Sequence, residues 1–208
     1  MLRDPDLEPK IELRAKLLAR RQAVGPDEVA ERDSRRTAAI LSRLKKMNPQ
    51  IIACYVGVEP EPGTLDLLGE LVDWGVEILL PSLHSARVPQ WAWWSGEPME
   101  PGLGGIPTPT SVPLPAKTLA RAEVIILPGL AGTPSGVRLG TGGGWYDRAL
   151  AHVSTDIPRW LVLNDSEVVD HLPYDPWDQP VTALVTEARW VDCTSANPTE
   201  PSGSMKEY

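Results

Sequence analysis

The chain has 208 residues, of which 42% are hydrophobic and 23% are charged. This is an ordinary globular composition, too apolar for an intrinsically disordered chain, and the length suits one domain. The formal net charge of -8 argues against nucleic acid as the main partner, because phosphate binding needs a basic face. We expect a single domain over residues 1–193 and a disordered tail over residues 194–208, which is rich in Ser, Thr and Pro.

Two features of the sequence point to the cytoplasm. The only cysteines, Cys54 and Cys193, lie far apart and form neither a disulfide framework nor a metal-binding spacing. No stretch approaches the roughly 20 apolar residues that span a bilayer, and residues 1–10 lack the apolar core of a signal peptide. We therefore expect a cytoplasmic protein with reduced thiols and no membrane partner.

The N-terminal part of the chain begins with two predicted helices. Apolar residues recur at helical spacing over residues 11–18 and 29–44, and Gly25-Pro26-Asp27 between them is typical of a helix start. The apolar run 51–56 then predicts a strand, Thr64 a helix N-cap and the run 76–80 a second strand. Strand, helix and strand in this order indicate a βαβ unit.

The remainder of the chain continues this alternation after a long irregular stretch. Residues 82–117 are rich in Pro, Gly and Trp, and we expect loops there with short irregular strands around Trp91–Trp94. The indoles of this segment either line the ligand pocket or, as we favour, pack in a core without Phe. Further strands are predicted over residues 123–127, 159–163 and 181–185, and a helix over residues 145–151. The alternation predicts an α/β fold whose mostly parallel sheet is covered on both faces and binds its ligand at the carboxyl ends of the strands. The first helix must then fold over that edge to take part.

The strongest motif is Arg-Leu-Gly-Thr-Gly-Gly-Gly-Trp-Tyr-Asp over residues 138–147, between a predicted strand and a predicted helix. Glycines let backbone amides converge, a helix N-terminus adds positive potential, and Arg138 adds a forked cation, which together suit a polyphosphate. The segment lacks the Gly-Lys-Ser/Thr of a Walker A loop and follows its strand too late for a dinucleotide fingerprint. The alternative interpretation is a flexible turn.

These residues resemble the 5-formyltetrahydrofolate cyclo-ligases, also called methenyltetrahydrofolate synthetases, whose hallmark is RLGxGxGxYD. The segments 10–14 and 61–64 are similar to the family's basic N-terminal element and its acidic, Thr-ending turn. Asp178, before the last predicted strand, resembles the family's late acid. One departure stands out, because Gly132-Thr133 occupies the place of the family's usual Phe-Asp.

The resemblance implies a role for each matching residue. Catalysis would involve Lys10 and Arg138, and two acids, Asp147 and Asp178, would bind Mg²⁺. The implied ATP contacts are Lys10, Arg14, Arg138, Leu139, Gly140, Thr141, Gly142, Gly143, Gly144, Trp145 and Tyr146. The implied folate contacts are Val56, Glu61, Thr141, Gly142, Gly143, Gly144 and Trp145.

Each of these residues also has a plain structural interpretation. Lys10 and Arg14 share a helix face and would otherwise form a solvated surface. Asp147 would otherwise interact with a helix dipole, and Glu61 and Asp178 would be ordinary acids of polar turns.

The resemblance further implies the activity: ATP- and Mg²⁺-dependent cyclisation of 5-formyltetrahydrofolate to 5,10-methenyltetrahydrofolate, with release of ADP and phosphate. It implies a three-layer Rossmann-like fold, a reduced folate and ATP as partners, and a monomer or weak homo-oligomer. Two alternatives remain open. A phosphosugar isomerase of related fold would need no ATP, and a non-catalytic folate- or nucleotide-binding protein would bind without releasing ADP.

Overall fold

The computed structural model describes residues 7–84 and 88–194, so nearly all of the predicted tail 194–208 lies outside the described residues. The α-helices are α1 (Leu7–Gln22), α2 (Pro26–Met47), α3 (Leu65–Asp73) and α4 (Trp145–Leu150). The strands are β1 (Ile51–Ala53), β2 (Glu77–Pro81), β3 (Gln90–Trp94), β4 (Glu100–Pro101), β5 (Pro107–Thr108), β6 (Leu114–Pro115), β7 (Val124–Pro128), β8 (Ala131–Gly132), β9 (Arg138–Leu139), β10 (Arg159–Val162), β11 (Ala183–Val185) and β12 (Trp190–Asp192). Short 3-10 helices are η1 (Leu103–Gly105), η2 (Ala116–Arg121) and η3 (Asp165–Glu167).

Eight strands form one sheet in the order β12-β11-β10-β7-β1-β2-β3-β6. The strands β11, β10, β7, β1 and β2 run parallel, while β12 and β3 join the two sides antiparallel. β8 and β9 form a separate hairpin. The predicted mostly parallel α/β sheet is thus confirmed.

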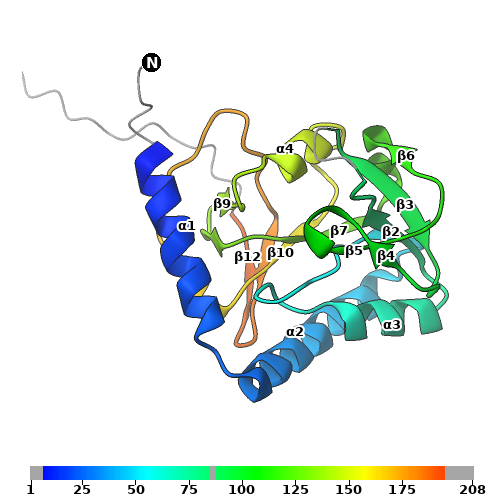
Figure 1. Ribbon diagram of the computed structural model, residues 1–208, viewed down its shortest axis with the longest axis horizontal. Coiled ribbons are helices and arrows are strands. Elements are labelled where there is room, and N and C mark those ends of the chain that lie inside the picture. The colour runs from blue at the N-terminus through cyan, green and yellow to red at the C-terminus, as the bar shows by residue number, and fades with distance from the viewer. Residues whose placement is uncertain (1–6, 85–87, 195–208) are drawn as a thin grey trace, which may run out of the picture.

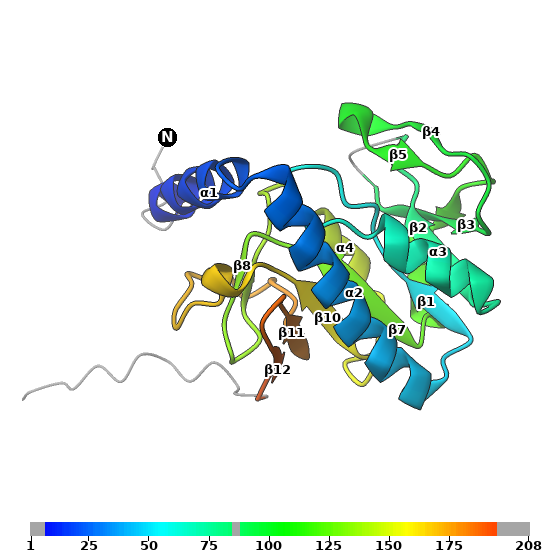
Figure 2. The same ribbon diagram turned by 90° about the horizontal axis from the view of Figure 1, so that it is seen from below.

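Helices cover both faces of this sheet because successive strand residues point to opposite sides. On one face Ile52, Ile78 and Ile126 pack with the apolar side chains of α2 and α3. On the other face Leu79 and Leu127 join a cluster that includes residues of η2 and α4. Figure 2 shows α2 and α3 lying across the first face, and Figure 1 shows α4 on the opposite side of the sheet. These three layers confirm the expected architecture.

The second helix follows from local sequence chemistry. Gly25 takes the extended conformation of an N-cap, Pro26 stands in the first turn, and Asn48 ends the helix in the left-handed conformation. The buried residues Arg36, Ile40 and Leu44 recur every four positions, so they lie on the one face that packs against the sheet.

Two local predictions need correction, and a third is confirmed in position only. Regular pairing ends at Ala53 rather than at Val56, and the Cys54 backbone N–H makes one last hydrogen bond to Leu79 O of β2 (2.9 Å). Trp91–Trp94 was expected in irregular strands, but β3 pairs in register with β2 and belongs to the main sheet. Thr64 stands at the N-cap of α3, yet its hydroxyl donates to Tyr55 O (2.6 Å) instead of capping the helix.

The first helix lies against the carboxyl ends of the strands, as required (Figure 1). Its Leu17 packs with Leu130, Ala131 and Leu139 around the β8–β9 hairpin. The Arg21 guanidinium near its end donates to Gly129 O at 2.6 Å, just beyond β7. None of the helices in residues 7–84 and 88–194 is long and apolar enough to cross a membrane.

Candidate active site

The β8–β9 hairpin presents Arg138 at the carboxyl ends of the parallel strands, which we call the carboxyl edge of the sheet. Only 6% of this residue is exposed, and one of its terminal nitrogens donates to Asp147 Oδ1 on α4. Its Nε is buried and meets no hydrogen-bond partner within the described residues. A buried guanidinium with an unused donor is a strong attractor for an anion, because an unsatisfied buried donor is costly.

The glycine-rich loop after Arg138 uses glycine at positions where the backbone takes a positive φ. Gly142 (φ 105°) and Gly144 (φ 59°) adopt left-handed conformations that favour glycine. Among the described residues, no backbone N–H of Gly140–Gly144 donates a hydrogen bond to the backbone or to a side chain. The following helix, α4, has six residues. The loop therefore offers uncommitted amides to a ligand.

Helix α1 brings its two predicted cations to the same place. Arg14 Nε donates to Gly140 O (2.9 Å), and its guanidinium lies against Gly142. Lys10 is 6% exposed, with Nζ 2.6 Å from Asp175 Oδ2 and 3.5 Å from Asp178 Oδ2. Lys10 is therefore not a solvated surface cation, and both residues meet segments more than a hundred positions away.

The two predicted metal ligands, Asp147 and Asp178, lie on either side of Gln179. The backbone N–H of Gln179 donates to Asp147 Oδ1 (3.1 Å), while Asp178 Oδ2 accepts from the backbone N–H of Asp175 (2.8 Å). No cluster of three or more metal-ligating side chains occurs in the described ranges. Mg²⁺ usually takes one or two carboxylates and completes its shell with phosphate oxygens and water. Asp147 Oδ2 accepts no hydrogen bond from any described residue, so this oxygen is available to such a site, whereas Asp178 Oδ2 lies 3.5 Å from Lys10 Nζ.

Glu61 and Val56 lie on the loop that follows β1, which side-chain hydrogen bonds hold in place. Tyr55 Oη donates to Pro62 O (2.8 Å), and the Glu61 amide donates to Val58 O (2.8 Å). Burial raises the pKa of the Glu61 carboxyl above its ordinary value, and the nearby charge of Arg21 opposes that rise. Val56 is buried in the core beside this loop.

Three aromatic rings join the glycine-rich loop to the sheet. Trp145 lies edge-on to Trp91 and to Tyr146, with ring centroids 5.2 and 4.9 Å apart. Trp91 is fully buried, which confirms the packing role expected for it. Burial raises the pKa of Tyr146 well above its usual range, and the charge of Glu61 adds to that rise. Tyr146 also packs against the core cluster that contains Val56.

Sequence reasoning missed a buried ion pair behind these residues. Arg21 Nε and one terminal nitrogen bind the two oxygens of Glu167 at 2.6 and 2.7 Å. The same carboxylate accepts from the backbone amide and side-chain nitrogen of Asn164. Arg21 and Glu167 are 146 positions apart and belong to no motif, so only their burial in the fold reveals them.

The structure gives a local account of Gly132-Thr133. A Cβ at Gly132 would lie 2.8 and 2.9 Å from terminal methyl carbons of Leu184 and Leu161, so a larger residue here would require these leucine side chains to move. The Thr133 hydroxyl accepts from the Val137 amide (3.1 Å) and pairs with the Ser135 hydroxyl (2.8 Å). Thr133 thereby closes the hairpin turn that precedes Arg138.

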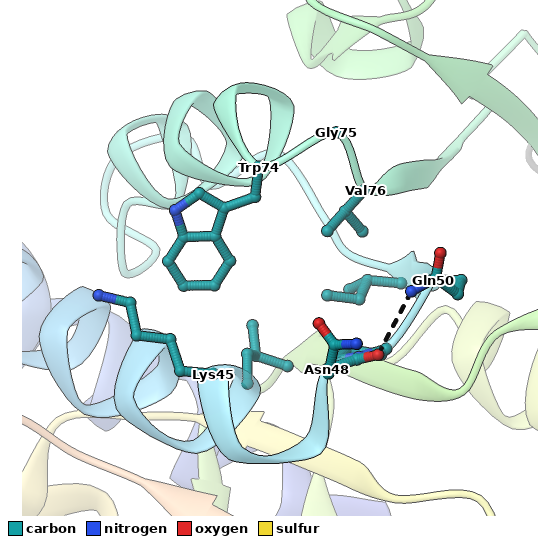
Figure 3. Close-up of a pocket in the computed structure, with 9 residues that line it drawn as sticks. Lys45, Asn48, Gln50, Trp74, Gly75 and Val76 are labelled. Carbon is teal, nitrogen blue, oxygen red and sulfur yellow. Dashed lines mark hydrogen bonds between the residues drawn. The ribbon is translucent and has the colours of Figure 1, made fainter.

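A cavity of about 230 Å³ lies at the amino ends of the strands β1 and β2, which we call the opposite edge of the sheet (Figure 3). Its wall includes the indole of Trp74, and Lys45 Nζ lies 5.2 Å from the centroid of that ring. Asn48 and Gln50 form its polar rim. The lining contains none of the residues that the sequence motifs single out.

Fold and geometry together define the class of this molecule: a mostly parallel α/β protein whose carboxyl edge gathers cations and uncommitted amides. Residues 6–187 match the model of the 5-formyltetrahydrofolate cyclo-ligase family. The chain belongs to this family of ligases.

Relatives and solved structures agree with this assignment. The chain is 35% identical over 187 residues to a 5-formyltetrahydrofolate cyclo-ligase of Mycolicibacterium smegmatis, covering 88% of this chain and 95% of the relative. The enzyme of the same name from Escherichia coli K12 is 27% identical over 176 residues, covering 82% and 96%. The NMR structure of Aquifex aeolicus 5,10-methenyltetrahydrofolate synthetase has a TM-score of 0.77 at 25% identity and covers 95% of this chain and 99% of its own. A Mycoplasma pneumoniae synthetase, 19% identical with a TM-score of 0.69, covers 86% and 98% and shares the fold.

Proposed function

We propose that this protein uses ATP and Mg²⁺ to cyclise 5-formyltetrahydrofolate to 5,10-methenyltetrahydrofolate, releasing ADP and phosphate. The observation that carries the proposal is the convergence of Arg14 and Arg138 on a loop with uncommitted amides, with Lys10 bound to the turn Asp175–Asp178. Family membership supplies the reaction, and this convergence supplies a place for the polyphosphate.

The two substrates would occupy opposite sides of the N-terminal turn of α4. ATP phosphates would bind the loop amides with Arg14 and Arg138, and Lys10 would add a contact because its ammonium has donors beyond those used by Asp175. The folate would lie near Glu61, Val56 and the ring of Trp145. A carboxylate such as that of Glu61 suits the N–H groups of a pterin ring, which are hydrogen-bond donors.

The chemistry needs activation of a poor leaving group. The formyl oxygen attacks the γ-phosphorus of ATP, the bond to the β,γ-bridging oxygen breaks, and ADP leaves. N10 of the folate then attacks the activated formyl carbon and loses its proton, and phosphate departs with the former formyl oxygen. Lys10, Arg14 and Arg138 would stabilise the negative charge of the transferring phosphoryl group through their fixed positive charges. This role requires no proton transfer, so we assign no general base.

Asp147 and Asp178 would hold the magnesium ion. When bound, Mg²⁺ supplies charge neutralisation of the β- and γ-phosphate oxygens. Arg138 competes for Asp147, since both cations use the same carboxylate. This pairing holds the Asp147 carboxylate in a fixed orientation before a nucleotide arrives.

One observation bears on the alternative of a binding protein that lacks turnover. Thr133 supplies the hydrogen bonds that close the hairpin, so the change from the family's usual Phe-Asp leaves Arg138 in place. This supports a catalytically competent loop.

The experiment follows the absorbance band of methenyltetrahydrofolate while 5-formyltetrahydrofolate, Mg²⁺ and ATP are mixed with the protein. We expect absorbance to rise only with ATP present and one ADP to form per product. A rise without ATP, or ligand binding without any rise, would contradict the proposal. Asp147→Asn, checked for normal thermal unfolding, should be strongly impaired at the same substrate concentrations.

A further inference from the structure

A short turn over Asp175–Asp178 lies beside the glycine-rich loop. Its two acids contact Lys10, and its other side chains have no assigned function. The Asp178 amide donates to Asp175 O (2.9 Å), and the Asp175 amide donates to Asp178 Oδ2 (2.8 Å). These reciprocal hydrogen bonds close the turn on itself. Its conformation is therefore fixed locally.

Two contacts also fix the turn in space. Lys10 of α1 binds Asp175 at 2.6 Å, and the Gln179 amide binds Asp147 of α4 at 3.1 Å. Figure 1 shows the segment before β11 passing between α1 and α4. The turn is thus a rigid element of the carboxyl edge, joined to the residues assigned above to ATP and Mg²⁺.

This rigid turn carries a large indole that the protein leaves uncovered. Trp177 is 67% exposed, and Tyr174, just before the turn, is 46% exposed. Other indoles nearby, such as Trp91, are buried in the core. An exposed aromatic pair on a fixed turn is a surface for a flat ligand ring, because stacking requires a ring held in place with one face free.

The position of the turn indicates which ring it meets. Neighbouring residues of a helix point about 100° apart, so Tyr146 and Asp147 face different sides. Tyr146 packs against Trp91 and the core cluster that contains Val56, where the folate would lie, whereas Asp147 faces Gln179 and the turn. The ligand that leaves the phosphate loop toward the turn is therefore the nucleoside of ATP.

We propose that Trp177 stacks on the adenine ring of ATP and so sets nucleotide affinity. This rests on the proposed function. Trp177 takes no part in the chemistry, because its contact is with the base and not with the transferring phosphoryl group. Its contribution belongs to ATP binding and not to the catalytic step.

The test compares Trp177→Ala and Trp177→Phe with Trp74→Ala, a control that removes an exposed indole (37%) at the opposite edge of the sheet. Calorimetry measures the binding of ADP and of inorganic tripolyphosphate, which has no base. We expect Trp177→Ala to weaken ADP binding about tenfold, which is about 1.4 kcal/mol, with tripolyphosphate unchanged. Trp177→Phe should restore most of the affinity, and Trp74→Ala should match the wild type.

Steady-state kinetics gives a second readout. Trp177→Ala should raise KM for ATP with kcat and KM for the folate unchanged. Equal ADP binding by wild type and Trp177→Ala, a loss shared by tripolyphosphate, a rise in KM for the folate alone, or no ADP binding by the wild type would each overturn the proposal. Because ADP binding needs no turnover, a wild type that binds ADP through Trp177 but forms no methenyl product would contradict only the proposed reaction.

Discussion

The two edges of the sheet differ in a way that cavity size does not reveal. At the opposite edge the cavity beside Trp74 has a volume of about 230 Å³, whereas the one lined by Arg21, Arg36 and Glu61 at the carboxyl edge has about 20 Å³. Yet buried Lys10, Arg138 and Arg21 all lie at the carboxyl edge. The cavity at the opposite edge is lined by residues from the ends of α2 and α3 and the segments that follow them. Buried charge and uncommitted amides identify the site better than volume does.

The largest expected effect separates the two edges by activity. Arg138→Met should lower kcat/KM about a thousandfold, because it removes the buried cation that we propose stabilises the transferring phosphoryl group. Lys45→Met, in the larger cavity, should leave kcat/KM unchanged. Steady-state assays with thermal unfolding of both variants provide the measurement. Similar losses of kcat/KM in the two variants would contradict the assignment of the site to the carboxyl edge.

The second prediction concerns stability at the carboxyl edge. Arg21→Met leaves the Glu167 carboxylate buried without its partner and should lower the free energy of unfolding by about 3–5 kcal/mol. Arg35→Met removes an exposed pair with Glu31 and should cost at most about 0.5 kcal/mol. Urea unfolding measures both values. If they prove equal, the buried network has no special part in the fold.

Two glycines offer a matched pair of smaller effects. Gly142 and Gly75 both adopt positive φ, at 105° and 74°, so alanine should destabilise each by about 1–2 kcal/mol. Only Gly142→Ala also places a methyl group in contact with the Arg14 guanidinium at the loop, and we expect its KM for ATP to rise about tenfold. Gly75→Ala should keep the wild-type KM. A KM rise in both variants would show that backbone strain alone is responsible.

The smallest effect is a pH dependence of stability. Because burial raises the pKa of Glu61 in the folded protein, the folded state binds its proton more tightly than the unfolded chain does. The stability that this proton provides is complete below the ordinary Glu pKa and is lost as the pH rises through the raised value. Glu61→Gln should therefore be more stable than wild type at pH 7, with the gain disappearing toward acid pH.

Exposed Glu77, at the opposite edge, provides the control for that measurement. Glu77→Gln should change the free energy of unfolding equally at both pH values. Urea titrations of the three proteins at pH 7 and near the ordinary Glu pKa provide the data. A constant difference between Glu61→Gln and wild type would contradict the assigned cause.

Much of the fold was predictable because its signals are local. Pro26 after Gly25 marks the start of α2, and the apolar runs at Ile51, Val124 and Arg159 mark three parallel strands. Strand β3 was not recognised as regular, because the Pro- and Trp-rich sequence around it resembles a loop and only pairing with β2 makes it a strand.

The site was predictable only in part for the same reason. Glycines 142 and 144 announce positive φ, and the motif marks Arg138 directly. The partners of Lys10 and Arg21 lie 165 and 146 positions away, so no spacing in the sequence indicates them. Long-range ion pairs depend on the packing of α1 across the sheet edge, which local patterns do not determine.

In the proposed reaction, a phosphoryl group passes from ATP to the formyl oxygen at the carboxyl edge of the sheet. The most direct test supplies 5-formyltetrahydrofolate labelled with ¹⁸O in the formyl group, together with ATP and Mg²⁺, and analyses the released phosphate by mass spectrometry. We predict one ¹⁸O atom in each phosphate, since the formyl oxygen leaves attached to phosphorus. Unlabelled phosphate accompanying methenyl product would contradict the account.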